Sequence, residues 1–203
     1  MKTETLIIRI HLSEGTIESF ELRNESQIQE VRQKVDPSRI FSHGRLVVAG
    51  ECFKSVFVAE RVLRVDLEHQ DIKVWDFPGG YADIVELTQE EFRQHAHLDE
   101  PELMAKRENC IPVGDLSVSF MELVMVGGTR FFMMLEFPVK LPAENQSYMR
   151  LVLSKGVLHM RLPCGGIGIV NLANVVSYTV YPGIAQVPAD TWLAERMPKN
   201  ATQ

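Results

Sequence analysis

Hydrophobic and polar residues alternate at the start of the chain. In LIIRIHL (residues 6–12), apolar residues occupy positions 6, 8, 10 and 12, while Arg9 and His11 have the opposite parity. This two-residue period predicts a strand with one buried face. SEGT (13–16) follows as a turn and IESFELR (17–23) as a return strand, so the segment is predicted to form a hairpin.

Two short helices are predicted from their capping residues. Asn24 has Gln27 three residues further on, which is the spacing of a capping box, and Pro37 ends the helix. Thr88 and Glu91 repeat this spacing at the start of LTQEEFRQHAHL. Both helices are expected to be short, because apolar periodicity continues for only a few turns in either segment.

Most of the remaining chain has the pattern of strands. RLVVAGE, SVFVAE and RVLRVDLEH predict three strands between residues 45 and 69. LSVSFMELVMV and TRFFMMLEFPV flank Gly127–Gly128, a pair that favours a hairpin turn because both residues can adopt positive φ. A second hairpin is predicted around SKG in YMRLVLSKGVLHMRL (148–162), and a closing helical turn at 189–197, packed through Trp192 and Leu193.

One strand is apolar at both parities. RFFMMLEF (130–137) has large apolar residues on both faces, so both faces are predicted to be buried. One face can cover the core of its own domain, and the other meets the partner unit or another chain. Methionine and phenylalanine are enriched in interface cores. An oligomer interface therefore has its candidate residues here: Phe131, Phe132, Met133 and Met134.

Two segments of the chain resemble each other. SHGRLVVAGECFKSVFVAERVLRVDL begins at Ser42, and SKGVLHMRLPCGGIGIVNLANVVSYTV begins at Ser154. Four residues of the first match the second at a constant offset of 112, and Val58 falls on Val170 before one extra residue shifts the frame. The four matched residues are Ser42, Gly44, Leu46 and Cys52. This similarity predicts two related β units.

The net charge of −6 is concentrated in the middle of the chain. Residues 71–117 hold 4 basic and 11 acidic residues, whereas the flanking regions are nearly neutral. An acidic segment between two balanced ones indicates a connector. The predicted fold is therefore α+β and mostly β, with two related small barrel- or sandwich-like units and a few short helices. Residues 1–70 form the first unit, 71–117 the connector with a helix, and 118–203 the second unit.

Composition limits the setting of the protein. No run approaches the roughly 18 apolar residues needed to cross a bilayer, and the N-terminus alternates like a strand, so we expect a cytoplasmic chain with no membrane contact. The three cysteines, Cys52, Cys110 and Cys164, are odd in number and widely spaced. They are expected to be reduced thiols.

The stretch LPCGGIGIVN (162–171) has the residues of a possible ligand loop: Cys164, Gly165 and Gly166. It lacks the spacing of the known phosphate loops and their lysine, and a strand follows it instead of a helix. The matching loop GECFKSVFV keeps the cysteine and loses the glycine pair. We favour glycines used for backbone geometry and buried, inert thiols, although His43 or His159 could approach a cysteine in space.

A second candidate ligand site is an aromatic loop. Trp75, Phe77 and Tyr81 surround PGG at 78–80, with acidic residues nearby. They either line a pocket or fix the connector to the body of the protein. His95 and His97 fall on the predicted helix two residues apart, where they point nearly opposite ways, so no metal site is predicted.

No nucleophile, base and metal set converges in the sequence, so no catalytic residues and no cofactor are predicted. The leading hypothesis is a non-catalytic binding or assembly module that forms a homo-oligomer; an enzyme remains a less favoured alternative, with a small-molecule site between the two units at Cys164, His159 or the aromatic loop. A tandem of small nucleic-acid-binding barrels is the other alternative, which the negative charge disfavours. Its basic patch would contain Arg130, Arg150, Lys155 and Arg161.

Overall fold

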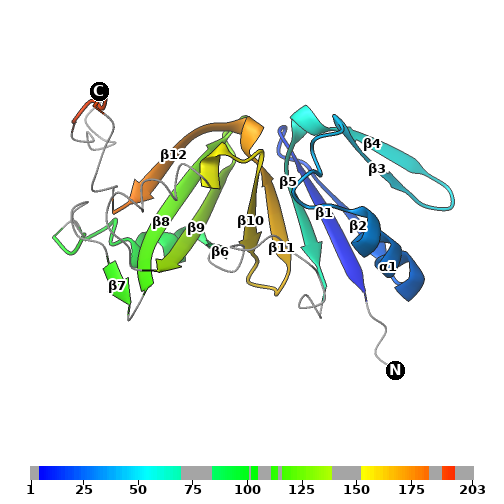
Figure 1. Cartoon of the computed structure of the whole chain (residues 1–203), viewed down its shortest axis with the longest axis horizontal. Coiled ribbons are helices and arrows are strands. Elements are labelled where there is room, and N and C mark those ends of the chain that lie inside the picture. The colour runs from blue at the N-terminus through cyan, green and yellow to red at the C-terminus, as the bar shows by residue number, and fades with distance from the viewer. Residues whose placement is uncertain are drawn as a thin grey trace.

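The computed structural model describes residues 5–69, 84–100, 102–104, 111–113, 116–138, 152–182 and 189–194. In this part of the chain, no helix is both long enough and apolar enough to span a membrane. Strands predominate over a few short helices, as the sequence predicts (Figure 1). The elements are β1 (Leu6–Leu12), β2 (Ile17–Leu22), α1 (Glu25–Lys34), β3 (Arg45–Ala49), β4 (Lys54–Val58), η1 (Ala59–Arg61), β5 (Val62–Glu68), β6 (Ile84–Leu87), α2 (Gln89–His95), β7 (Ile111–Val113), β8 (Leu116–Met125), β9 (Arg130–Pro138), β10 (Val157–Arg161), β11 (Ile167–Asn171), η4 (Leu172–Asn174) and β12 (Val175–Tyr181).

One sheet runs through both halves of the protein. Its ten strands follow the order β12-β8-β9-β6-β10-β11-β5-β1-β2, with β7 paired to β8 beside this path. The remaining two strands, β3 and β4, form a separate hairpin. In Figure 1 this hairpin lies at one side of the molecule and β12 at the other, with β11 and β5 between them.

The β8–β9 hairpin and the N-caps of both helices are present where the local sequence predicts them. Gly127 and Gly128 turn β8 into β9 with φ of 85° and 86°. The Thr88 side chain accepts from the Glu91 amide, and the Glu91 carboxylate accepts from the Thr88 amide, which completes the capping box of α2. In α1, Asn24 is the cap but accepts from the amide of Ser26.

The paired strands β5 and β11 separate two hydrophobic cores. Val65 of β5 and Ile169 of β11 lie opposite one another and belong to the core beneath α1. Val170 has the opposite parity and belongs to the core of the second half. Every residue of β11 is buried as a result. Its position between two cores explains why this strand has no polar side chain from Ile167 to Val170.

The strand β9 also has both faces covered within the chain. Phe131 and Met133 are buried in the core of the second half. Phe132 and Met134 pack on the opposite face, in a third cluster centred on Phe92 of α2. The apolar character that predicted an interface here is thus accounted for by α2, which the acidic connector provides.

The connector is part of the sheet. β6 lies between β9 and β10, antiparallel to β9 and parallel to β10. Val85 is the partner of Arg161 in the parallel pair. In the described part of the connector, β6 and β7 enter the sheet while α2 covers β9, so these elements belong to the folded body.

Two sequence predictions near the C-terminal end are wrong. Residues 152–154 form a helical turn where a strand was predicted, so β10 begins only at Val157. Trp192 and Leu193 are 94% and 71% exposed, and residues 191–194 have no regular secondary structure. These two side chains therefore do not pack against the protein as predicted.

Candidate functional site

Three of the six predicted ligand-binding residues lie in the part of the chain that the structure describes. Trp75, Phe77 and Tyr81 lie outside the described residues. Cys164 and Gly165 are exposed in the turn between β10 and β11, whereas Gly166 is buried. The turn leads directly into β11, so it presents no helix N-terminus to an anion.

Backbone geometry explains both glycines of this turn. Gly165 has a φ of 89°, which side chains rarely tolerate. Gly166 lies against β5, where a Cβ atom would be 2.6 Å from the carbonyl oxygen of Leu67 and 3.0 Å from Cα of Glu68. The neighbours are backbone atoms and cannot rotate away, so glycine at 166 allows β11 to approach β5.

Replacing Gly166 with alanine is expected to lower the free energy of unfolding by about 1–3 kcal/mol, because the two strands must separate. Urea denaturation followed by far-UV circular dichroism measures the change. Gly156→Ala is the matched control, since its Cβ would have nothing within 4 Å. Equal stability of Gly166→Ala and the parent protein would contradict the close approach.

The cysteines of the two matching turns are exposed, which corrects the expectation of buried thiols. Cys52 follows β3 and Cys164 follows β10, and each lies at the tip of a turn. His159 is buried inside β10, and this burial lowers its pKa despite a hydrogen bond with the backbone of Pro37. Because the ring of His159 is buried and the thiol of Cys164 is exposed, His159 is not placed as the base that a cysteine–histidine site requires.

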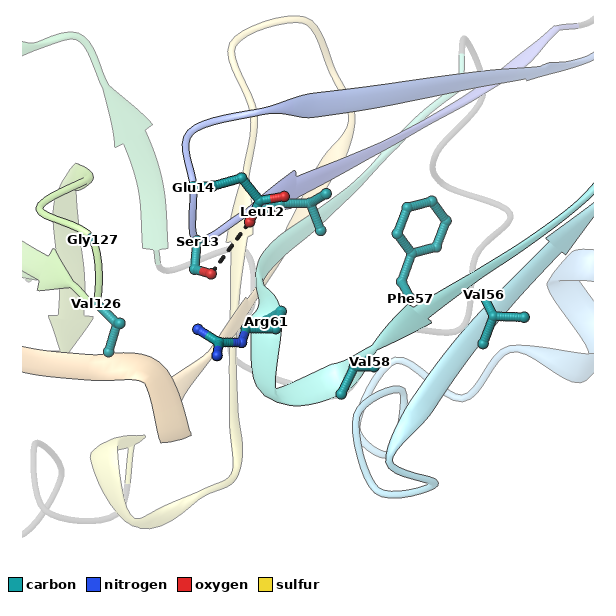
Figure 2. Close-up of a pocket in the computed structure, with 9 residues that line it drawn as sticks. All are labelled: Leu12, Ser13, Glu14, Val56, Phe57, Val58, Arg61, Val126 and Gly127. Atoms are coloured by element: carbon teal, nitrogen blue, oxygen red, sulfur yellow. Dashed lines mark hydrogen bonds between the residues drawn. The ribbon is translucent and has the colours of Figure 1, made fainter.

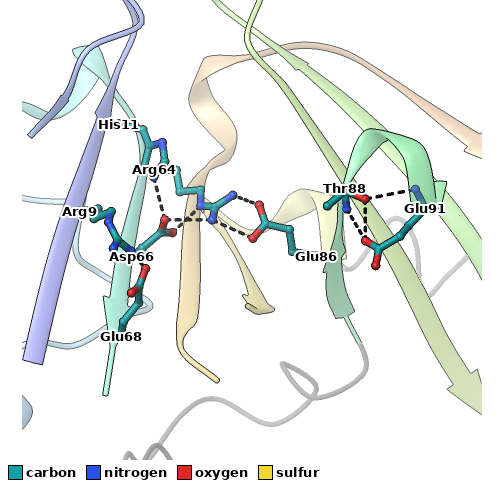
Figure 3. A network of polar contacts seen from close by, with 8 residues as sticks. All are labelled: Arg9, His11, Arg64, Asp66, Glu68, Glu86, Thr88 and Glu91. Carbon is teal, nitrogen blue, oxygen red and sulfur yellow. Dashed lines mark hydrogen bonds and ion pairs between the residues drawn. The ribbon is translucent and has the colours of Figure 1, made fainter. Parts of the chain in front are cut away.

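A buried ionic network joins the first half and the connector (Figure 3). Arg64 of β5 is only 5% exposed and lies between Asp66 and Glu86. Its Nη2 donates to Asp66 Oδ2 and to Glu86 Oε2, both at 3.0 Å. The guanidinium carbon is 5.0 Å from the ring centroid of Phe131, and His11 Nε2 is 2.7 Å from Asp66 Oδ2.

Hydrogen bonds keep these groups charged in spite of burial. Burial by itself raises the pKa of Asp66, but the hydrogen bonds from His11 and Arg64 outweigh it and hold that pKa below its usual range. Burial by itself lowers the pKa of Arg64, and the bonds to Glu86 and Asp66 raise it further than burial lowers it. The network is a fully paired structural connection, and no group of three or more His, Cys, Asp or Glu residues in the described part could hold a metal ion.

In the described part of the chain, two open grooves each lie beside a strand that has a partner on one side only. A groove of about 510 Å³ runs between β4, the β1–β2 turn and the β8–β9 turn (Figure 2). Its lining residues are Leu12, Ser13, Glu14, Val56, Phe57, Val58, Arg61, Val126 and Gly127. A groove of about 460 Å³ follows β12 and is lined by Leu153, Leu172, Val175, Val176, Ser177 and Tyr178.

Both grooves border exposed apolar side chains. Val56 and Val58 of β4 are each 53% exposed, and Val176 and Tyr178 of β12 are 65% and 50% exposed. Among the described residues, β4 pairs only with β3, and β12 pairs only with β8. In the described part of the chain, each strand therefore has one edge without a partner strand next to apolar surface, which is the form of a strand-pairing interface.

Sequence reasoning missed these two edges although a signal was present. KSVFV and VVSYTVY carry apolar residues at both parities, as RFFMMLEF does. Of the predicted basic patch, Arg130 is paired with Glu122, while Arg161 and Lys155 are exposed on β10 and before it. Arg150 lies outside the described residues.

Comparison of the chain with protein-family models, curated proteins and solved structures found no match.

Proposed function

We propose that this protein is a non-catalytic binding and assembly module that self-associates through its free strand edges. The observation that carries this proposal is the pair of exposed, apolar edges at β4 and β12, each beside an open groove. A long free edge with exposed valine and tyrosine side chains is an aggregation hazard in a monomer. A defined partner strand removes that hazard.

The polar chemistry of the described residues supports an assembly role over catalysis. The strongest cluster of charges is buried, and in it Asp66 and Glu86 neutralise the guanidinium of Arg64. The grooves themselves are lined mainly by valine, leucine, phenylalanine and tyrosine, with few titratable groups. Such surfaces bind a strand or an apolar face better than they activate a substrate.

Light scattering coupled to size exclusion tests self-association. The full chain at tens of micromolar is expected to give a mass above the 23.0 kDa of one copy, and to dissociate on dilution. A mass of one chain throughout the concentration range would overturn the proposal. Added RNA or DNA oligomer serves as a check on the nucleic-acid alternative, which predicts a salt-dependent complex.

A further inference from the structure

We propose that copies of this chain assemble head to tail, with β4 of one copy pairing antiparallel to β12 of the next. The pairing repeats, between chains, the register in which β11 pairs with β5 inside the chain. This inference rests on the proposed self-association and specifies its edges, its register and its partner, a second copy of the same chain. Equivalence of the two halves is part of the proposal.

The first support is the order and pairing of elements in the two halves. In the first half, β1 pairs with β2 and β5, β3 pairs with β4, and η1 separates β4 from β5. In the second half, β8 pairs with β9 and β12, β10 pairs with β11, and η4 separates β11 from β12. Element for element, β4 corresponds to β11 and β5 to β12.

The second support is a set of matching backbone hydrogen bonds. The amide of Ser13 donates to the carbonyl of Arg61, and the amide of Val126 donates to that of Asn174, so both partners shift by 113 residues (13 to 126 and 61 to 174). The bonds that close the two hairpin turns also match: Leu12 to Thr16 and Met125 to Thr129. The offset between corresponding residues changes from 112 to 113 inside the turns that follow β3 and β10, earlier than in the sequence alignment.

The halves differ in what their corresponding strands contact. β11 and β5 pair with each other, and nearly all their residues are buried. The corresponding strands β4 and β12 have no such partner among the described residues. Side chains of β4 alternate between exposed and half-buried, and those of β12 are exposed at 176–178 and half-buried elsewhere. Each copy therefore has two free edges at opposite sides of the molecule: β4, which corresponds to β11, and β12, which corresponds to β5 (Figure 1).

The register within the chain predicts which residues meet. Ile169 of β11 lies opposite Val65 of β5, and they are 0% and 1% exposed. At the shift of 113 residues (56 to 169 and 65 to 178), their counterparts are Val56 and Tyr178, which are 53% and 50% exposed. The proposed pairing places these two exposed residues opposite one another and buries both.

The groove beside β4 has the position that the partner chain would fill. Its lining residues Val58, Arg61 and Glu14 correspond to Asn171, Asn174 and Gly127 of the second half. Each of these three counterparts contacts the first half. The side chain of Asn171 donates to the carbonyls of Ala59 and Val62, that of Asn174 donates to Val62, and Gly127 packs against the carbonyl of Ser13.

The predicted ladder has a defined end. Gly166, which allows β11 to approach Leu67 closely, corresponds to Phe53, and Phe53 stacks on Phe20 with ring centroids 5.9 Å apart. A phenylalanine cannot make the approach of a glycine at that position. The ladder between chains therefore covers Lys54–Phe57 and stops before Phe53.

Two edges of different kind make a heterologous contact, which generates a ring or an open filament. Such a contact can be tested by complementation. Val56→Asp disables the β4 edge and leaves β12 intact, while Tyr178→Asp does the reverse. Each variant alone is expected to lose association in light scattering. An equimolar mixture is expected to give a particle of two chains, because one intact edge remains on each variant.

Leu103→Asp is the control, because Leu103 is 55% exposed, lies outside β4 and β12 and lines neither groove, and its variant should associate like the parent protein. Circular dichroism spectra and unfolding curves like those of the parent identify folded variants. A cysteine experiment gives a second measurement in a background where Cys52, Cys110 and Cys164 are serine. Val56→Cys and Tyr178→Cys proteins should form a disulfide heterodimer when mixed, and neither should cross-link alone.

The outcomes separate this inference from the proposed function. A parent protein that is monomeric overturns both. A parent that associates, with variants that neither complement nor cross-link in the mixture, overturns the head-to-tail pairing and leaves self-association standing. Cross-linking of Val56→Cys with itself indicates a symmetric β4–β4 contact and also overturns the proposal.

Discussion

Replacing Arg64 with methionine is expected to lower the free energy of unfolding by about 3–5 kcal/mol, the usual cost of removing one partner from a buried ion pair. Methionine keeps the apolar stem of the side chain but removes the cation that lies between Asp66 and Glu86. The side chain of Asp66 is 4% exposed and that of Glu86 is 22% exposed. Denaturant unfolding near neutral pH measures the loss.

The exposed ion pair Arg23–Glu21 provides the control for this prediction. Its side chains are 75% and 43% exposed, so Arg23→Met should leave stability close to that of the parent protein. The Arg64→Met variant should also recover part of its deficit in mildly acid solution, where the freed carboxylates take up protons. A loss no larger than that of Arg23→Met would show that the network contributes little.

Replacing Phe92 with alanine is expected to cost about 3–5 kcal/mol, the usual range for a large aromatic residue in a core. Phe92 is 1% exposed, and its ring lies 5.0, 6.3 and 6.0 Å from those of Phe132, Phe120 and Tyr181. The cavity would lie between α2 and the outer face of β9. Thermal unfolding, with near-UV circular dichroism to report aromatic packing, measures the effect.

Trp192→Ala is the control for the loss of a large aromatic ring. Trp192 is 94% exposed, and its removal should change the midpoint of thermal unfolding very little. If Phe92→Ala were equally mild, α2 would not be what covers β9. The surface around Phe132 and Met134 would then again be a candidate oligomer interface.

Local features of the fold were predictable from sequence because short segments determine them. The turn at Gly127–Gly128 and the capping box of Thr88 and Glu91 need only neighbouring residues, and both are present. The glycines of the β10–β11 turn were also correctly assigned to backbone geometry. Their particular cause, the approach of Gly166 to β5, required a strand about a hundred residues away.

Features that depend on distant partners were not predictable. Arg64 and Asp66 alternate with apolar residues in RVLRVDLEH, a pattern that predicts a solvated face, yet Glu86 and His11 make burial of that face possible. Cys52 and Cys164 were expected to be buried and inert because no helix begins beside them and only Lys54 lies near Cys52 in the sequence, but turns between hairpin strands place both at the surface. Similarly, the second apolar face of β9 was explained only by the position of α2.

The pairing of β5 with β11 determines when the first half can fold during synthesis on the ribosome. β5 is complete at residue 68, but its partner β11 begins at residue 167, so the nascent chain carries an open strand edge while the intervening residues are made. Contacts of such long sequence separation fold slowly and expose apolar surface in the meantime. Folding of the first half is therefore expected to finish only after the second half has been synthesised. Chaperone binding should be strongest for nascent chains that end between residues 68 and 167.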